Sequence, residues 1–156
     1  MTRVERWIRH HHHLFLLAAA IFGGLLPSAV LAADETDAIA YRRHLMKAMS
    51  EQAAALGMVL QDKGPAENAA FHARAIALNA QAAVKAFEAN VPGGEARPEI
   101  WRDWPDFTKR LKNLYDGANE LAVIAERNGL AAMQARAMNV LTCKSCHDAY
   151  KLRPGR

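Results

Sequence analysis

The chain has 156 residues, 51% of them hydrophobic, and a formal net charge of +4. This length suits one domain around a single core. The charged residues are scattered, which argues against a dedicated nucleic-acid surface, and the absence of internal repeats and of alternating strand patterns argues against solenoid and all-β folds.

The first segment has the pattern of an export signal. Residues 1–13 carry three arginines and four consecutive histidines, and an apolar run follows as far as Ala32. This order predicts a secretory signal peptide over residues 1–32. Two adjacent glycines and Pro27 interrupt the run, which disfavours the alternative of an uncleaved membrane anchor. Cleavage removes three arginines and one glutamate, so the net charge falls from +4 to +2.

The remaining chain, residues 33–156, contains four stretches in which apolar residues recur at steps of three and four, the period of a packed helix. Short breaks separate these stretches, so we predict an all-α fold, an antiparallel four-helix bundle in up-down-up-down order. The expected helices run from Asp34 to Gly64, from Pro65 past Phe87, from Pro105 to Asn128, and from about Leu130 past His147.

The expected buried face of the first helix is apolar except for one arginine. The second helix has a wider expected stripe. The long connection of residues 91–104 carries three apolar anchors, and we expect at least one of them to pack over the bundle end or the edge of a bound group. The first face contains Ile39, Arg42, Met46, Met49, Ala53, Leu56 and Leu60; the second contains Phe71, Ala75, Leu78 and Ala82, flanked by Ile76, Val84 and Phe87; the anchors are Ile100, Trp101 and Trp104.

Near the C-terminus the sequence reads Cys143-Lys144-Ser145-Cys146-His147, and these are its only two cysteines. A C-x-x-C-H run is typical of covalent haem attachment, with two thioethers to the porphyrin and the imidazole on iron. On a helix, residues three and four apart share one face, so all three side chains can address one macrocycle. The motif therefore predicts one covalently bound haem c, with His147 as an iron ligand.

Three other uses of the two cysteines are less well supported. A thiol redox motif is expected beside a βαβ pattern, and a zinc site needs a fourth ligand; neither is found. A disulfide between helical residues three apart has poor geometry. Haem attachment also agrees with export, which points to the periplasm of a bacterium, where thiols are committed to some bond.

A second axial ligand must come from earlier in the chain, because no methionine follows His147. Met133 and Met138 share its helix, so they cannot reach the opposite side of the iron. The first helix offers Met46, Met49 and Met58, and an up-down-up-down order gives Met46 the best matching depth. The alternative is that Met46 only fills the core. His44 and His72 are weaker candidates and are expected to be surface or partly buried polar residues.

Arg42 lies one turn before Met46. A guanidinium at a core position needs an anionic partner, and the haem propionates are carboxylates at about that depth. The alternative is an arginine at the bundle end that extends to water.

Three segments together resemble the class II c-type cytochromes, the cytochrome c-prime family: DAIAYRR-HLMKAM, ARPEIW and CKSCHDAY. The resemblance implies a haem at one end of the bundle, thioethers at Cys143 and Cys146, and His147 as proximal ligand. It also implies that the distal position falls on Met46 and the nearby arginine on Arg42.

The family resemblance implies two possible functions, neither of them enzymatic. Leu45-Met46-Lys47 looks like the low-spin branch, in which methionine ligates iron, so we expect an electron carrier that exchanges electrons with redox partner proteins. The alternative is an open, five-coordinate haem that binds NO or CO. Open-site members often have an arginine where this chain has Lys151. By analogy, a homodimer through the first two helices is possible.

Overall fold

The computed structural model describes residues 27–153, with side chains from Glu35 onward. Residues 1–26 of the predicted signal peptide lie outside the described part. The chain divides into two units, Met1–Thr36 and Asp37–Arg156, and the bundle lies within the second. The helical elements are α2 (Pro27–Val59), a short 3₁₀ helix (Ala66–Asn68), α3 (Ala69–Glu88), α4 (Glu99–Arg102), α5 (Trp104–Asn128), α6 (Leu130–Val140) and α7 (Cys143–Tyr150).

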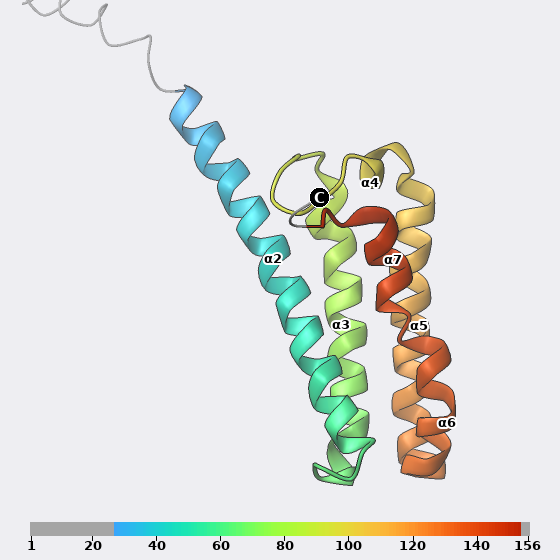
Figure 1. The fold of residues 1–156 in the computed structure, drawn as a ribbon. Helices are drawn as coiled ribbons and strands as arrows, with labels where there is room; N and C mark the ends of the chain where they lie inside the picture. The colour runs from blue at the N-terminus through green and yellow to red at the C-terminus, as the bar shows by residue number, and fades with distance from the viewer. Residues whose placement is uncertain (1–26, 154–156) are drawn as a thin grey trace, which may run out of the picture. The chain divides into compact units, whose positions relative to one another are not determined.

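The prediction of an all-α four-helix bundle is confirmed. From Asp37 onward, α2 forms the first helix of the bundle, α3 the second and α5 the third, while α6 and α7 follow one another as the fourth (Figure 1). Proline lies in the first turn of α5, as expected. Gly129 ends this helix with φ of 83°, a conformation that glycine adopts readily. None of the described helices combines the length and apolar character of a membrane span.

The predicted start of the first helix differs from the observed one. The helix α2 begins at Pro27, earlier than the predicted Asp34. Three of the six residues between them are alanines, which favour helix, and proline is well tolerated in a first turn.

One continuous fourth helix was predicted, and this is wrong. The helix breaks at Leu141 and Thr142, and Thr142 has φ of −88° and ψ of 43°. The Thr142 carbonyl accepts hydrogen bonds from the Ser145 backbone nitrogen at 3.1 Å and from Ser145 Oγ at 2.8 Å. These bonds satisfy the start of a new helix, so Cys143 opens α7 and the whole C-x-x-C-H motif lies on this short separate helix.

The predicted face of α2 is confirmed. Arg42, Met49 and Leu56 are buried, and the other members of the face are half-buried. The predicted stripe of α3 is wrong at its two largest early members, because Phe71 and Leu78 are 64% and 63% exposed. Small residues form the contact instead, since alanines allow α3 and α5 to approach closely and bulky side chains then face outward. The buried alanines are Ala69, Ala73, Ala77, Ala80 and Ala83 on α3 and Ala118 and Ala122 on α5.

A second, aromatic cluster packs at the end of the bundle that carries α4 and α7. Phe107 makes edge-on contacts with Phe87 and Tyr150, a favourable arrangement of aromatic rings. The ring centroids of these two pairs are 5.2 Å and 5.3 Å apart. Ile100 is 2% exposed within this cluster, and Trp101 Nε1 donates to the Phe87 carbonyl at 2.9 Å. The prediction that the connection anchors pack over the bundle end is therefore confirmed.

The long connection also approaches α2 closely at two glycines. Gly93 and Gly94 have φ of 123° and 61°. A Cβ at Gly93 would lie 2.7 Å from Ile39 Cδ1. Both the backbone conformation and the close contact require glycine here, so this pair brings the loop against α2.

Two helical glycines give a test of the packing. A Cβ at Gly117 on α5 would lie 2.7 Å from Val140 Cγ1, whereas a Cβ at Gly57 on α2 meets nothing within 4 Å. We expect Gly117→Ala to lower the free energy of unfolding by about 1–3 kcal/mol, because Val140 is stiff and must shift. Gly57→Ala is the control and should raise it by about 0.5–1 kcal/mol. Denaturant unfolding measures both; equal effects of the two changes would contradict the packing of α6 on α5.

Candidate haem site

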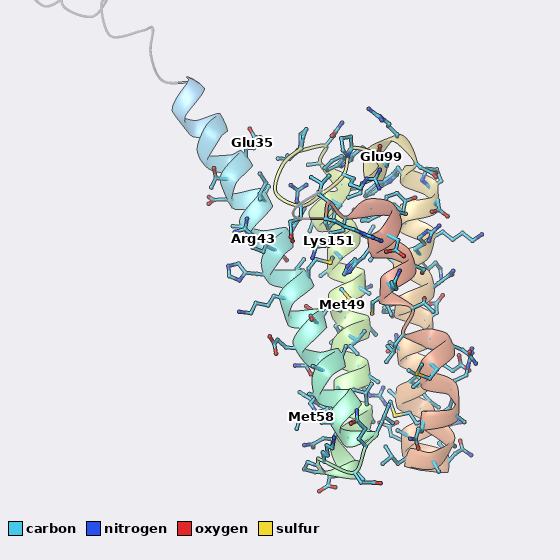
Figure 2. All side chains as sticks on the ribbon, viewed as in Figure 1. Glu35, Arg43, Met49, Met58, Glu99 and Lys151 are labelled. Atoms are coloured by element: carbon cyan, nitrogen blue, oxygen red, sulfur yellow. The ribbon has the colours of Figure 1, made fainter. Side chains whose placement is uncertain are left out.

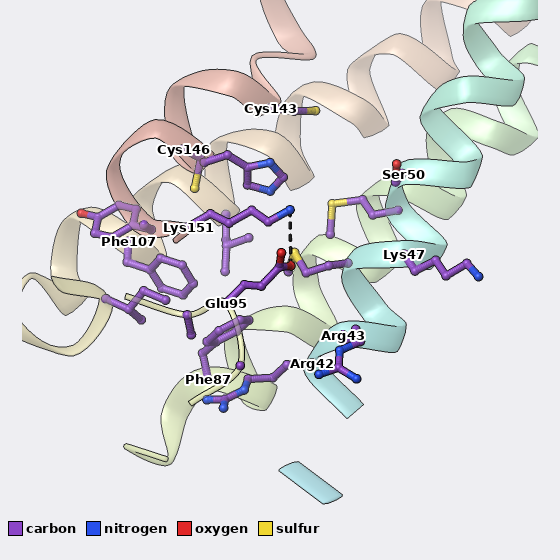
Figure 3. Close-up of a pocket in the computed structure, with 18 of the residues that line it drawn as sticks. Arg42, Arg43, Lys47, Ser50, Phe87, Glu95, Phe107, Cys143, Cys146 and Lys151 are labelled. Carbon is purple, nitrogen blue, oxygen red and sulfur yellow. Dashed lines mark ion pairs between the residues drawn. The ribbon is translucent and has the colours of Figure 1, made fainter. Parts of the chain in front are cut away.

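One cavity of about 440 Å³ lies among α2, α3, α5, α7 and the long connection. All of the site residues predicted from the sequence line it: Arg42, Met46, Cys143, Cys146 and His147. Figure 3 shows Cys143 and Cys146 on α7 and Arg42 on α2. The cavity lies within residues 37–151, and its size is that of a pocket for an organic cofactor.

The two cysteines are free thiols on one wall of the cavity. Cys143 is exposed and Cys146 is half-buried. Burial raises the pKa of the Cys146 thiol, and the nearby Arg110 partly opposes this rise. The residues that the structure describes contain no cluster of three or more His, Cys, Asp or Glu that could hold a metal ion.

The imidazole of His147 lines the same wall. Partial desolvation and the charge of Lys151 lower the pKa of His147, and Glu95 and Asp148 partly oppose them. A lowered pKa favours neutral imidazole, the form that binds metals. The neighbouring Asp148 is paired with Lys144 and Arg153, each at 2.5 Å.

The methionines differ clearly in burial and in whether they line the cavity. Met46 and Met49 line the cavity. Met58 is 53% exposed near the end of α2, and Figure 2 shows Met49 between it and the level of Lys151. On α6, Met133 is fully buried in the central core and Met138 is 85% exposed, as the exclusion of both from ligation requires. The candidates for a sulfur ligand are thus reduced to two.

Arg42 places a buried guanidinium in the lining of the cavity. Its side chain is 3% exposed, so the alternative of an arginine that extends to water is wrong. Among the residues that the structure describes, neither terminal nitrogen of Arg42 has a hydrogen-bond partner. The guanidinium lies 5.0 Å from the Phe87 ring centroid and 5.6 Å from that of Trp101. Burial lowers the pKa of Arg42, yet an arginine stays charged. A buried, unpaired charge calls for a counter-ion, and the carboxylates of a haem fit this requirement.

The two histidines that were weaker ligand candidates, His44 and His72, lie outside the cavity lining. His44 is exposed and lies outside the cavity lining. His72 Nδ1 lies 2.7 Å from Gln52 Oε1. The expectation that both are polar surface or partly buried residues is confirmed.

Sequence reasoning missed the side chains that link the long connection to the C-terminal segment. Lys151 Nζ and Glu95 Oε2 form an ion pair at 3.4 Å, drawn as a dashed line in Figure 3. Beside it, the Leu152 backbone nitrogen donates to the Glu95 carbonyl at 2.8 Å, and the Arg97 nitrogen donates to the Tyr150 carbonyl at 3.0 Å. The only signal in the sequence was the Gly-Gly-Glu run, which predicted a loop but not its partner.

A four-helix bundle whose end pocket is walled by a C-x-x-C-H helix defines the class of c-type haem proteins with a helical bundle. The chain belongs to the cytochrome c′ family, whose model matches residues 37–151. Cytochrome c′ of Alcaligenes xylosoxydans is 30% identical over 122 residues, 76% of this chain and 96% of the relative. Cytochrome c′ of Rhodospirillum rubrum is 34% identical over 125 residues, 77% of this chain and 85% of the relative.

Solved structures agree with this assignment. Ferric cytochrome c prime from Alcaligenes xylosoxidans has a TM-score of 0.69 and 27% identity, covering 76% of this chain and 96% of its own. A nitric oxide complex of a single-residue mutant of the same protein has a TM-score of 0.69 and 27% identity. The match covers 76% of this chain and 97% of that chain. Members of the family are non-enzymatic proteins that carry one covalent haem c, and Cys143 and Cys146 are the C-x-x-C pair for it here.

Replacing both cysteines tests the attachment. Cys143→Ala with Cys146→Ala should abolish covalent haem, because the sequence has no other thiol, and should lower stability because the cavity loses its filler. A haem stain of the denatured chain on a gel measures attachment. Ser145→Ala, which changes the motif between its cysteines, is the control and should keep the haem. Haem that remains on the doubly substituted chain after denaturation would contradict the assignment.

Proposed function

We propose that this protein binds NO and CO at a five-coordinate haem iron, with His147 as its only protein ligand. The observation that carries the proposal is the similarity to Alcaligenes cytochrome c prime, for which nitric oxide complexes are among the solved structures that match. The sequence analysis preferred electron transfer, but these complexes support its alternative better.

The surroundings of Met46 support an open iron site. Met46 is half-buried and packs against both the central and the aromatic clusters. A side chain held by contacts on two sides serves as an apolar wall, which favours small apolar gases over water at the iron. In this proposal Met46 limits the space beside the iron and does not bind it.

We assign the haem carboxylates to Arg42. Its buried nitrogens have no hydrogen-bond partner in the described part of the chain, and the guanidinium lies over the rings of Phe87 and Trp101. A charged hydrogen bond from a rigid arginine would fix the orientation of the macrocycle within the cavity.

Electron transfer remains the second candidate, because Met46 and Met49 place two thioethers in the cavity lining. A methionine on iron would give a six-coordinate, low-spin haem that changes little on reduction, and redox partner proteins would then be the physiological partners. The spin state and the response to CO distinguish the two candidates.

We further propose export to the periplasm, which is typical of this family, after removal of residues 1–32. A homodimer through α2 and α3 is proposed as well. Tyr41 on α2 is 55% exposed, and Phe71 and Leu78 on α3 are 64% and 63% exposed. Phe71 and Leu78 lie two turns apart on α3 and so share one face of that helix, and exposed apolar faces are typical of interaction surfaces.

CO binding tests the proposed function. We expect the reduced protein to be high-spin and to bind CO. Met46→Ala should leave the gas-free spectrum unchanged and raise CO affinity about tenfold or more, because removing an apolar obstacle relieves crowding worth about 1–3 kcal/mol. Met58→Ala is the matched control, because Met58 is an exposed methionine on the same helix outside the cavity lining, and it should leave the CO affinity unchanged. A low-spin reduced spectrum that CO does not alter, and that Met46→Ala converts to high-spin, would establish the electron carrier instead.

The proposed role of Arg42 predicts that Arg42→Met changes the free energy of unfolding differently with and without haem. In the haem-free chain, Arg42→Met should be neutral or stabilising, because it removes a buried charge without a partner. In the haem-bearing protein it should lower the free energy of unfolding by about 3–5 kcal/mol, because the buried carboxylates lose their cation. Chemical denaturation of both forms measures this. The exposed Arg127 on α5 lies outside the cavity lining and, changed to Met, is the control. Equal losses in both forms would rule out carboxylate binding.

A further inference from the structure

The helix that carries the haem motif is tied to α5 by a buried tyrosine. Tyr150, the last residue of α7, is 6% exposed and lines the haem cavity. Its hydroxyl donates to Asp106 Oδ2 at 2.7 Å. Asp106 lies in the first turn of α5, so this bond joins two helices whose residues are far apart in the sequence.

Arg110, one turn further along α5, pairs with the same carboxylate of Asp106. Its Nε lies 2.5 Å from Asp106 Oδ2, and its guanidinium lies 5.7 Å from the Tyr150 ring centroid. Its terminal nitrogen donates to the Ser145 carbonyl at 3.4 Å. Ser145 stands between the two cysteines, so Arg110 reaches inside the haem-attachment motif.

The charges of this group are stable near neutral pH. The hydrogen bonds from Tyr150 and Arg110 hold the pKa of Asp106 below its usual value, and Asp106 raises the pKa of Arg110. Burial and the bond to Asp106 raise the pKa of Tyr150 to about 12, so its hydroxyl stays a donor. A negative carboxylate and a positive guanidinium therefore face the motif together.

We propose that Asp106 is a positioning residue for the haem iron: it fixes α7 through Tyr150 and balances the charge of Arg110 beside the motif. The proposal goes beyond the proposed function, since it holds whether the iron binds a gas or carries an electron. An exposed ion pair alone is worth little, and the side chains of Arg110 and Asp106 are 37% and 36% exposed. The buried tyrosine and the contact with Ser145 distinguish this pair from the other pairs on α5.

The test uses the reduction potential of the haem-bearing protein. Asp106→Asn should raise it, because the unpaired Arg110 cation disfavours ferric iron. Arg110→Gln should lower it, because the carboxylate is then unpaired. General loosening of the helix would move both in the same direction. Asp116→Asn is the matched control. It breaks the exposed ion pair of Asp116 with Lys112, in which Nζ and Oδ2 lie 2.6 Å apart and the residues are likewise four apart on α5. This change should leave the reduction potential unchanged.

Where the ferrous iron is five-coordinate, its iron–histidine stretching band, measured by resonance Raman, tests the positioning itself; the reduction potential tests it in either coordination state. Asp106→Asn and Tyr150→Phe should shift or broaden the band, and Asp106→Glu, which keeps the carboxylate, should restore it in part. If Asp106→Asn does not accumulate with covalent haem, Arg110→Gln and Tyr150→Phe carry the test. The proposal is overturned if Asp106→Asn and Arg110→Gln move the potential in the same direction, or no more than Asp116→Asn does.

Discussion

A positive charge buried without a protein partner is the constraint on which the rest of this structure depends. Arg42 is 3% exposed and is held by the ring faces of Phe87 and Trp101, which compensate only a small part of its lost hydration. The protein thus keeps an unfavourable site in its own core. Such a site is stable only when an anionic group completes it, so cofactor binding and stability are coupled in this bundle.

The two hydrophobic clusters have different roles: the central cluster stabilises the bundle, and the aromatic cluster surrounds the binding cavity. In the central cluster, α3 and α5 meet through alanines, and close helix packing gives a rigid frame. At the other end, aromatic side chains and the glycine loop of residues 93–94 surround the cavity. Met46 contacts both clusters, so the side chain beside the predicted iron position is anchored by the frame as well as by the site.

The haem motif lies on a helix that would have little stability alone. The helix α7 has only eight residues and is separated from α6 by the break at Leu141 and Thr142. Contacts from elsewhere in the chain hold it: Asp106 on α5 binds Tyr150, and Glu95 of the long connection pairs with Lys151. The environment of His147 is therefore set by residues far away in sequence, which allows the same motif to serve haems with different properties.

The sequence by itself determined the chemistry, because covalent haem attachment needs only a local pattern, and the C-x-x-C-H run supplies it within five residues. It also determined the four helices and the buried face of α2, since both follow from a regular period. The tertiary structure alone decided which face of α3 is buried, where the fourth helix breaks, that Arg42 lacks a partner, and that Asp106 and Glu95 hold the motif helix. These features depend on how closely helices approach and on contacts between distant residues, which a local pattern does not encode.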